Sequence, residues 1–507
     1  MTLKQQLGLI AWGLFALSAA TSLWVPFTGD QYFFAVGARE IAGGARLYLD
    51  FWDVKQPGIY WIYLAASYFP LELAQAVRAL EIVSWAVTSL LAMRIVAAAT
   101  AGSSIAVMTP ALVGGAVLLA APSWHLSQVE SFAVLPLMYI AHELTGGRLR
   151  ASYWLSVGVA LACLAFLKLL LLAIGGMLVL AGLWQQSRTK PRATYGRLLV
   201  ASAWVACGFL VTAGILSIPL LMSGSFSEFI RVSFVYPFSV LTADSAAPIS
   251  RLLGSLLWLL ATSFPLAILA AVSLFRSASP GARAVKLILI VWLVAALFVM
   301  LIQRNSWWAY HTTLLKPPLL MLGLIVLAQL AARADWWPEC PTLKLAGGSL
   351  CLLFALAAAP AYSQLQRKLD LAFVFTISYE DQQRYLNALA PGYPAVQRQS
   401  QWSRAQRASS LCVIGDPAVL FFAGKQCPVS VATWSGAALS KEMWRRMATE
   451  FSLTRPELVY VATSDRQAVE AHAPVLLLWL EANYDFVAPG QGTDRWYRVR
   501  SNDLAKP

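Results

Sequence analysis

The feature that most constrains this chain is a succession of apolar segments long enough to cross a lipid bilayer. A transmembrane helix needs about twenty apolar residues, and such runs recur throughout residues 7–362. Hydrophobic residues make up 59% of the 507, whereas charged residues make up only 12%, against about 25% in a soluble domain. So little polar surface cannot cover a folded chain in water. We therefore predict an α-helical polytopic membrane protein.

About eleven spans are expected from the length of these runs. They cover residues 7–27, 77–99, 104–121, 132–145, 152–167, 169–184, 198–221, 252–275, 286–303, 313–331 and 345–362. The first run is followed by further spans, so we interpret it as an uncleaved anchor rather than a signal peptide. Residues 57–71 are short for a span, and we expect an interfacial or re-entrant helix there. Lys168 interrupts one long apolar stretch and predicts the outer turn of a helical hairpin.

The lysine and arginine residues between the spans indicate their orientation. Basic residues occur at Lys4 and in the connections 146–150, 185–197, 276–286 and 332–344. All of these lie on one side if the N-terminus is cytoplasmic, as the positive-inside rule requires. The net charge of +13 therefore reports topology, and no basic cluster interleaved with aromatic residues suggests nucleic acid. An odd number of spans places the C-terminal region outside. We expect the membrane to be a bacterial inner membrane, with this region in the periplasm.

The composition becomes that of a soluble domain from about Gln364 onward. Strands are expected at 410–414, 429–432, 458–462 and 485–488, and helices at 441–451 and 467–481. This alternation predicts a small α/β domain. We divide the chain into a membrane domain, 1–362, with a first exterior loop, 28–76, and a periplasmic α/β domain, 363–507. Because the GxGxxG spacing is absent, the Gly415-Asp416-Pro417 turn is interpreted as structural.

The six cysteines form no CxxC pair. Cys163, Cys207 and Cys351 lie in apolar runs, where we interpret them as small buried hydrophobes. Cys412 and Cys427 are in the α/β domain, and a disulfide between them is possible if that domain faces an oxidising compartment. The sequence leaves this question open.

Charged residues at the edge of the membrane are costly and are candidates for function. Asp30 follows the first span, where its carboxylate can accept a proton from a hydroxyl or cap a helix over residues 31–42. We expect this amphipathic helix to lie along the membrane surface and to end at Gly43 and Gly44. Lys55, in the same exterior loop, can bind a phosphate or be a paired or snorkelling lysine.

Further charged residues lie at other exterior helix ends. Glu130, beside His125, can act in the site or stabilise a helix N-terminus. Lys168, Arg304 and His311 lie at the exterior ends of other spans. Because few other basic residues are expected on that side, their convergence indicates a common function.

The order of these motifs resembles the GT-C glycosyltransferases, which include the lipid A aminoarabinose transferases and the protein O-mannosyltransferases. The resemblance covers most of residues 1–362. It is carried by Gly29-Asp30 and the following helix, the loop 47–58 (LYLDFWDVKQPG), 129–136 (VESFAVLP), Phe166-Leu167-Lys168, and Tyr310-His311 before Pro317-Pro318. The segments 413–416 (VIGD) and 455–459 (RPELV) are similar to the exterior domains of bacterial members.

The resemblance implies a glycosyltransferase that takes a sugar from a polyprenyl-phosphate donor and inverts the anomeric carbon. Asp30 matches the catalytic base or acceptor-orienting aspartate, and Lys55 matches a lysine that contacts the donor phosphate. Cations would stabilise the phosphate leaving group. We predict catalytic roles for Asp30 and Glu130. We predict substrate binding by Lys55, Lys168, Arg304, His311, Arg39, Asp50 and Trp52, with Trp307 and Trp308 as further rings for sugar stacking.

The sequence also departs from the family's pattern. Gln31 follows the aspartate where a glutamate is common, which weighs against a protein acceptor, and Gln56-Pro57 follows Lys55 where Pro-Pro is common. We expect no cofactor and no metal requirement, although Asp30, Asp50 and Glu130 have the carboxylates to bind a divalent ion. The expected partners are the lipid-linked donor, membrane lipids and a glycan, lipid or protein acceptor.

Two other classes of function remain open. A transporter or flippase of lipid-linked glycans would place ionisable residues in the middle of several spans. Here Glu81 and Arg94 share one span, and the carboxylates gather in the exterior loops, which favours chemistry at the membrane surface. A non-catalytic scaffold would tolerate the loss of Asp30.

Overall fold

The computed structural model describes most of the chain and divides it into two compact units. The described residues are 1–146, 150–189, 194–237, 247–275, 280–304, 306–332, 364, 368, 384, 386–390, 392–431, 439–489 and 494–500. Unit 1 contains Met1–Val25, Ala74–Leu216 and Ala246–Ile377, and unit 2 contains Pro26–Leu73, Ser217–Ser245 and Ser378–Pro507. Each unit is therefore assembled from segments that are distant in the sequence.

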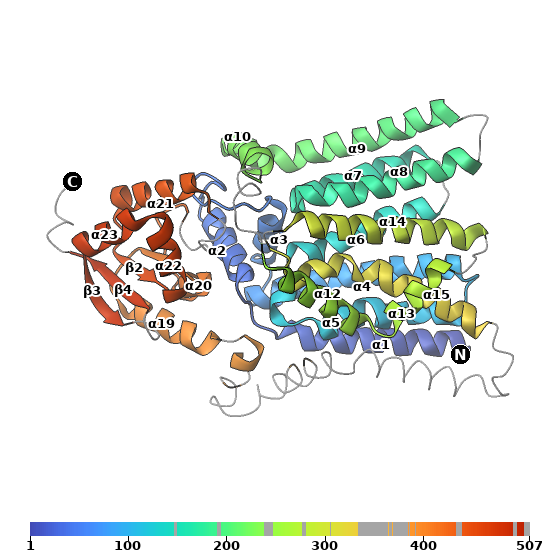
Figure 1. Ribbon diagram of the computed structural model, residues 1–507, viewed down its shortest axis with the longest axis horizontal. Coiled ribbons are helices and arrows are strands. Elements are labelled where there is room, and N and C mark those ends of the chain that lie inside the picture. The colour runs from blue at the N-terminus through green and yellow to red at the C-terminus, as the bar shows by residue number, and fades with distance from the viewer. Residues whose placement is uncertain are drawn as a thin grey trace. The chain divides into compact units, whose positions relative to one another are not determined.

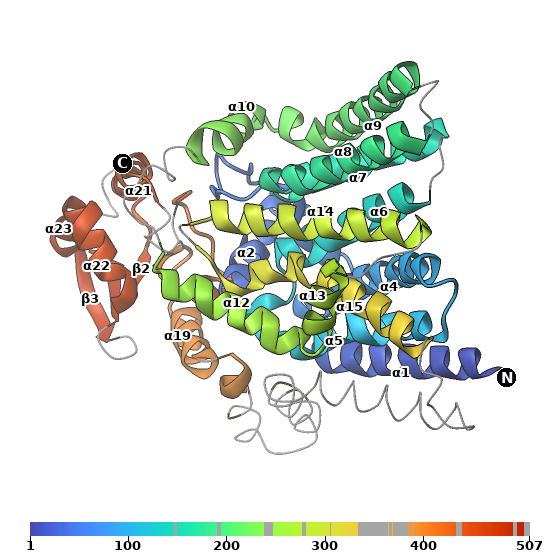
Figure 2. The ribbon, with the colours of Figure 1, turned by 45° about the vertical axis from the view of Figure 1, so that its right-hand side comes forward.

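Unit 1 is a helical bundle (Figure 1, Figure 2). Its elements are α1 (Leu3–Leu23), α4 (Leu73–Ala99), η1 (Ser104–Met108), η2 (Pro110–Gly115), α5 (Ala116–Ala120), η3 (Ser123–His125), α6 (Val129–Thr145), α7 (Ala151–Leu167), η4 (Leu169–Leu171), α8 (Leu172–Thr189), most of α9 (Thr194–Met222), α12 (Ile249–Ser263), α13 (Leu266–Phe275), α14 (Pro280–Ile302), η7 (Ala309–Leu314) and α15 (Lys316–Ala331). The predicted spans from 7–27 to 313–331 all coincide with helical segments. The span predicted at 345–362 lies outside the described residues.

The lengths of these helices suit a bilayer. Among the described residues, five helices are long and apolar enough to cross a membrane, and three shorter apolar helices accompany them. The chain is therefore a multi-pass membrane protein. The span predicted over 252–275 is not one straight helix, because α12 and α13 meet at an angle of 95°. Pro265 explains the break, since Phe264 before it is extended (ψ 140°) and cannot continue the helix.

Two glycines allow α7 and α9 to approach closely. A Cβ atom at Gly158 would lie 2.1 Å from the carbonyl oxygen of Val205, and one at Gly208 would lie 2.1 Å from that of Leu155. Any larger residue at either position would push the helix backbones apart. Small residues at such crossings are typical of helix packing in membranes, where dispersion contacts replace the hydrophobic effect.

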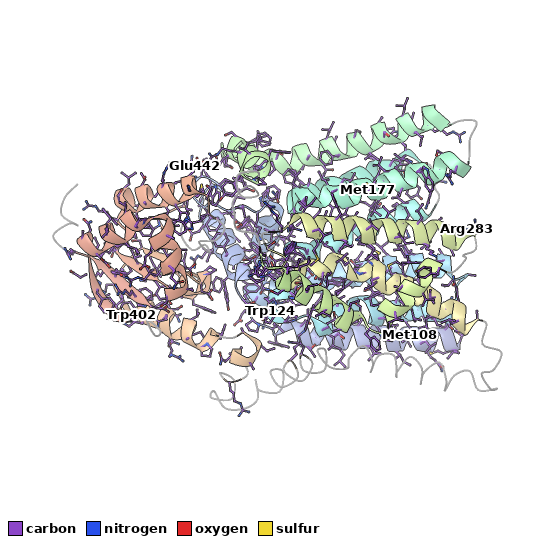
Figure 3. The ribbon with its side chains drawn as sticks, in the orientation of Figure 1. Met108, Trp124, Met177, Arg283, Trp402 and Glu442 are labelled. Atoms are coloured by element: carbon purple, nitrogen blue, oxygen red, sulfur yellow. The ribbon has the colours of Figure 1, made fainter. Side chains whose placement is uncertain are left out.

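The two ends of the bundle carry different residues. Lys4 Nζ donates to the carbonyl oxygen of Gly102 at 3.1 Å, so the start of α1 and the end of α4 share one end. Arg283 belongs to that end, and Trp124 lies at the opposite one (Figure 3). Lys168 joins α7 to η4 and α8 in an extended conformation. The helical hairpin predicted there is confirmed.

Unit 2 combines the first exterior loop with the C-terminal region. The loop forms α2 (Asp30–Ala42) and α3 (Gly58–Ala66), and a later segment forms α10 (Phe226–Ile230) and η6 (Arg231–Val235). The helix expected after Asp30 is confirmed. However, α2 is buried from Gln31 to Ala38, because it packs between α3 and α20 (Pro417–Ala423). This burial exceeds that of an amphipathic surface helix.

The C-terminal region forms the predicted α/β domain around a four-stranded sheet. Its elements are α19 (Tyr393–Ala405), β1 (Leu411–Ile414), α20, α21 (Lys441–Thr454), β2 (Leu458–Val461), α22 (Thr463–His472), α23 (Pro474–Asn483), β3 (Tyr484–Pro489) and β4 (Arg495–Val499). The strand order is β1-β2-β4-β3, with β1 and β2 parallel and the other pairs antiparallel. Cys412 is the partner of Val459 across the parallel pair.

The sequence misplaced several elements of this domain. Residues 429–431 form no strand, because Glu450 binds both the backbone N–H and the hydroxyl of Ser430. The helix expected over 467–481 is divided into α22 and α23 at Pro474. Strand β4 was not expected at all. Asp416 caps α20 by accepting from Ala418 N at 2.9 Å, which agrees with a structural turn.

Candidate functional site

Asp30 and Lys55 form an ion pair in unit 2. Lys55 Nζ lies 3.4 Å from Asp30 Oδ2, and 39% of the Asp30 side chain and 20% of the Lys55 side chain remain exposed. Asp30 opens α2, but the helix is capped by Gly29 without a side-chain hydrogen bond. The carboxylate is thus accessible and is not used as a helix cap. A carboxylate beside an ammonium group offers a proton acceptor and an anion-binding cation together.

A buried network supports the turn that carries Lys55. Asp53 is fully buried and accepts from Val54 N at 2.6 Å and from the Tyr60 hydroxyl. The Tyr48 hydroxyl donates to the Lys55 carbonyl oxygen at 2.8 Å. Burial raises the pKa of Asp53 to about 6, despite the opposing effects of Lys55 and the Tyr60 hydrogen bond. The network fixes the backbone from which Lys55 projects.

Three other residues predicted to bind substrate make contacts within unit 2. Arg39 donates to the carbonyl oxygens of Phe421 at 3.2 Å and Lys425 at 3.0 Å. Asp50 pairs with Arg46 at 2.8 Å on the surface. Trp52 is 1% exposed, and its ring packs edge-on against Tyr236. The first and third of these contacts hold the exterior loop in place, and substrate contact by these three residues stays a prediction.

A second charged cluster lies in unit 1 at the start of α6. Glu130 is 2% exposed, and its Oε1 lies 2.7 Å from Lys168 Nζ and 2.9 Å from His311 Nδ1. Lys168 also donates to Gln303 Oε1, and His311 Nε2 lies 3.2 Å from the Ser306 hydroxyl. Gln128, rather than Glu130, is the N-cap of α6. The predicted convergence of Glu130, Lys168 and His311 is therefore present.

Two more cationic or imidazole groups accompany this cluster, and sequence reasoning missed their importance. Lys316 is 2% exposed and opens α15, and its ammonium group has no hydrogen bond or ion pair with the described residues. His125 is buried, which lowers its pKa well below the ordinary value, and the charges of Lys316 and His311 lower the pKa further. The signal for Lys316 was a charge inside the apolar run 313–331.

The remaining residues predicted for this side of the membrane are more exposed. Arg304 is exposed, and its carbonyl oxygen accepts from Ala247 N at 2.9 Å. Trp308 is 48% exposed, and its ring is covered by the Arg251 guanidinium at 4.3 Å from the ring centroid. Trp307 adopts a positive φ of 42°. A role for any of them with substrate stays a prediction.

The positions of the potential metal-binding side chains were also considered. Within the residues that the structure describes, no three His, Cys, Asp or Glu side chains gather in a way that could hold a metal ion. Asp30 and Asp50 in particular each pair with a basic side chain. Metal independence remains an expectation.

The chain was compared with protein families, curated proteins and solved structures. No protein-family model matches the chain, and no curated protein matches its sequence. Among solved structures, the chain is similar to the crystal structure of ArnT from Cupriavidus metallidurans bound to undecaprenyl phosphate. The TM-score is 0.60 at 14% sequence identity, and the match covers 98% of each chain. The chain therefore has an ArnT-like fold over nearly its whole length, which confirms the GT-C-like architecture predicted from its sequence.

Proposed function

We propose that this protein is a membrane glycosyltransferase that uses a polyprenyl-phosphate-linked sugar. The observation that carries the proposal is the exposed Asp30–Lys55 pair, held in a protein with the fold of ArnT. The ArnT structure contains undecaprenyl phosphate, and a lipid of that class suits a chain with many apolar helices. We further propose that the reaction takes place at the periplasmic face of the inner membrane.

Asp30 acts as the base in this proposal. The acceptor hydroxyl, hydrogen-bonded to Asp30, attacks the anomeric carbon from the face opposite the phosphate. The bond from carbon to the phosphate oxygen breaks, the hydroxyl proton passes to Asp30, and the configuration inverts. Lys55 binds the departing lipid phosphate, because an ammonium group stabilises the charge that develops there. Holding both groups in one pair places base and cation before substrate arrives.

Within unit 1, the cluster around Glu130 is a separate group of cations that suits an anion such as a phosphate. Lys168, His311 and Lys316 are suitable groups, and Lys316 lies at a helix N-terminus, where the dipole also favours an anion. Glu130 was predicted to be catalytic. Its oxygen is buried between Lys168 and His311, so we propose that it positions these two groups instead of accepting a proton from substrate.

The test is a transfer assay with radiolabelled polyprenyl-phosphate sugars and membrane extract as the source of acceptor. Wild type should move label from at least one donor into an acceptor. Asp30→Asn should reduce the transfer rate by at least about 100-fold, the lower range for loss of a general base. Asp485→Asn is the matched control, because it removes an exposed aspartate that pairs with Arg500 on the surface, and it should transfer like wild type.

Two results would contradict the proposal. Equal transfer by wild type and Asp30→Asn, at matched expression, would remove Asp30 from the mechanism. No transfer from any donor, together with movement of the donor across proteoliposome membranes, would instead support the hypothesis of a transporter. The sugar and the acceptor would be identified by the label itself.

A further inference from the structure

Cys412 and Cys427 lie side by side in the α/β domain. Their Sγ atoms are 2.8 Å apart. Cys412 is on β1 and fully buried, whereas Cys427 is partly exposed. The backbone enforces this proximity, because Ser410 and Gln426 form a parallel bridge and Leu411 N donates to the Gln426 carbonyl oxygen at 2.9 Å. A bond of about 2.0 Å between the sulfurs requires only a small side-chain movement.

We propose that these two thiols are the site of an intramolecular disulfide, formed by exchange with a disulfide-carrying thiol oxidoreductase. Cys427, the more accessible thiol, attacks the oxidoreductase disulfide as a thiolate and releases one oxidoreductase thiol. Cys412 then attacks the mixed disulfide and releases the second. Two cysteine thiols are oxidised to one disulfide, and the oxidoreductase disulfide is reduced to two thiols. The proposal rests on the expected periplasmic location of the domain.

The position of the bond gives it a function. The chain between the two cysteines contains α20, and α20 with its following turn holds the first exterior loop. Arg39 donates to Phe421 and Lys425, and the ring of Tyr32 packs against those of Phe421 and Phe422 at 5.3 Å between centroids. A disulfide here fixes both ends of the segment on which α2 rests.

The segment after Cys427 makes a second contact with the same loop. The Ser430 carbonyl oxygen accepts from Trp52 N at 3.0 Å, one residue before Asp53 in the turn that carries Lys55. In the dithiol form, Cys427 Sγ also donates to the Val429 carbonyl oxygen at 3.3 Å. The disulfide removes this hydrogen bond, so the support then passes through the backbone from Cys427 to Ser430. The disulfide would therefore support the exterior loop through both α20 and the 427–430 segment, without contacting a substrate.

The other described cysteines do not offer this chemistry. Cys163 and Cys207 lie in the helices α7 and α9, and neither has a second cysteine sulfur in contact among the residues that the structure describes. They are suitable internal controls, because neither should appear in a linked peptide. Cys207 is exposed on α9 and not buried as expected from its apolar run, and α9 is one of the helices that could cross a membrane.

The experiment uses the 507-residue protein, purified from membranes without reductant. Acid first stops thiol exchange, and the free thiols are then alkylated before digestion. Mass spectrometry should find the peptides of Cys412 and Cys427 joined and lighter by two hydrogens, and reduction should separate them. Cys412→Ser should leave Cys427 alkylated. The Tm of the Cys412→Ser/Cys427→Ser double variant should fall by about 5 °C, as expected for loss of a short disulfide loop, and Cys207→Ser should leave both the linked peptides and the Tm unchanged.

Two outcomes would overturn the proposal. One is complete alkylation of both cysteines in unreduced wild-type protein. The other is a linkage of either residue to a different cysteine. Because no substrate is used, failure here leaves the proposed transferase activity untouched, and failure of the transfer assay leaves the disulfide measurement valid.

Discussion

The buried carboxyl group of Asp53, in the exterior loop, is subject to opposing effects on its ionisation. Desolvation favours its neutral form, whereas Lys55 and the Tyr60 hydroxyl favour the ionised form. A pKa of about 6 in place of 3.8 corresponds to about 3 kcal/mol of preference for the neutral form. Above pH 6 the folded protein holds an ionised Asp53 at this cost. At the residue scale, the loop is therefore held less tightly at neutral pH than in mild acid.

The sign of this effect gives a testable prediction for Asp53→Asn. Between about pH 4 and pH 6 the folded state binds more protons at this residue than the unfolded state, so the contribution of Asp53 to stability falls as pH rises. The variant has no such proton, so its Tm should rise relative to wild type from pH 4 to pH 7. Thermal unfolding in detergent measures the difference. A difference that stays constant over this range would contradict the shifted pKa.

At the scale of elements, hydrogen bonds from buried charged residues connect segments that are far apart in the sequence. Arg78 and Glu81, both on α4 and at most 1% exposed, pair at 3.5 Å. Glu81 also accepts from Ser127 N and the Ser131 hydroxyl, before and within α6. Glu81 was notable in the sequence as a charge within a span. Its partners show a structural role, because burying a carboxylate is costly unless the group is paired and hydrogen-bonded.

Glu130 makes the corresponding connection among α6, Lys168 and η7. Glu130→Gln would leave the buried His311 and the partly exposed Lys168 without their anion. We therefore expect a drop in Tm and a higher KM for the lipid-linked donor, with a smaller change in kcat. Glu143→Gln, farther along the same helix, is the control and should change neither by much. If Glu130→Gln instead abolished kcat at unchanged Tm and KM, Glu130 would be a catalytic group and not a positioning residue.

At the scale of the whole molecule, each compact unit is built from segments far apart in the chain. The first exterior loop meets residues synthesised much later, as the Arg39 contacts with Phe421 and Lys425 show. Contacts of such sequence separation slow folding, because they require the closure of a long loop. Unit 2 is therefore completed only when the C-terminal domain has been made. The loop that carries Asp30 and Lys55 depends on that domain for its shape.

The orientation in the membrane is the prediction that belongs to this scale. Alkaline phosphatase fused after residue 507 should be active in cells, because the enzyme folds only outside the cytoplasm, whereas a fusion within the basic 185–197 connection should be inactive. A cytoplasm-only fluorescent reporter at the same two positions should give the opposite pattern. Activity of the phosphatase at the internal position alone would invert the topology and exclude a periplasmic site at Asp30.

The sequence by itself determined that the chain folds in a lipid bilayer, the succession of its spans and the presence of a C-terminal α/β domain. These follow from apolar run length and local alternation, which act over short stretches of chain. Asp30, Lys55, Glu130, Lys168 and His311 could also be chosen from the sequence, because charges at membrane edges are costly wherever they occur. The bend at Pro265 was not predicted, since one span was expected over 252–275. Its 95° angle accompanies the packing of α13 against α15.

Only the tertiary structure decided which charges meet and which residues support them. The pairing of Lys55 with Asp30 and the burial of Asp53 depend on the approach of α2, α3 and the turn between them. The burial of α2 depends on α20, nearly four hundred residues later in the chain. Local sequence carries no record of such distant partners. The physical reason is that burial and pairing are properties of the packed molecule, whereas periodicity and hydropathy are properties of the segment.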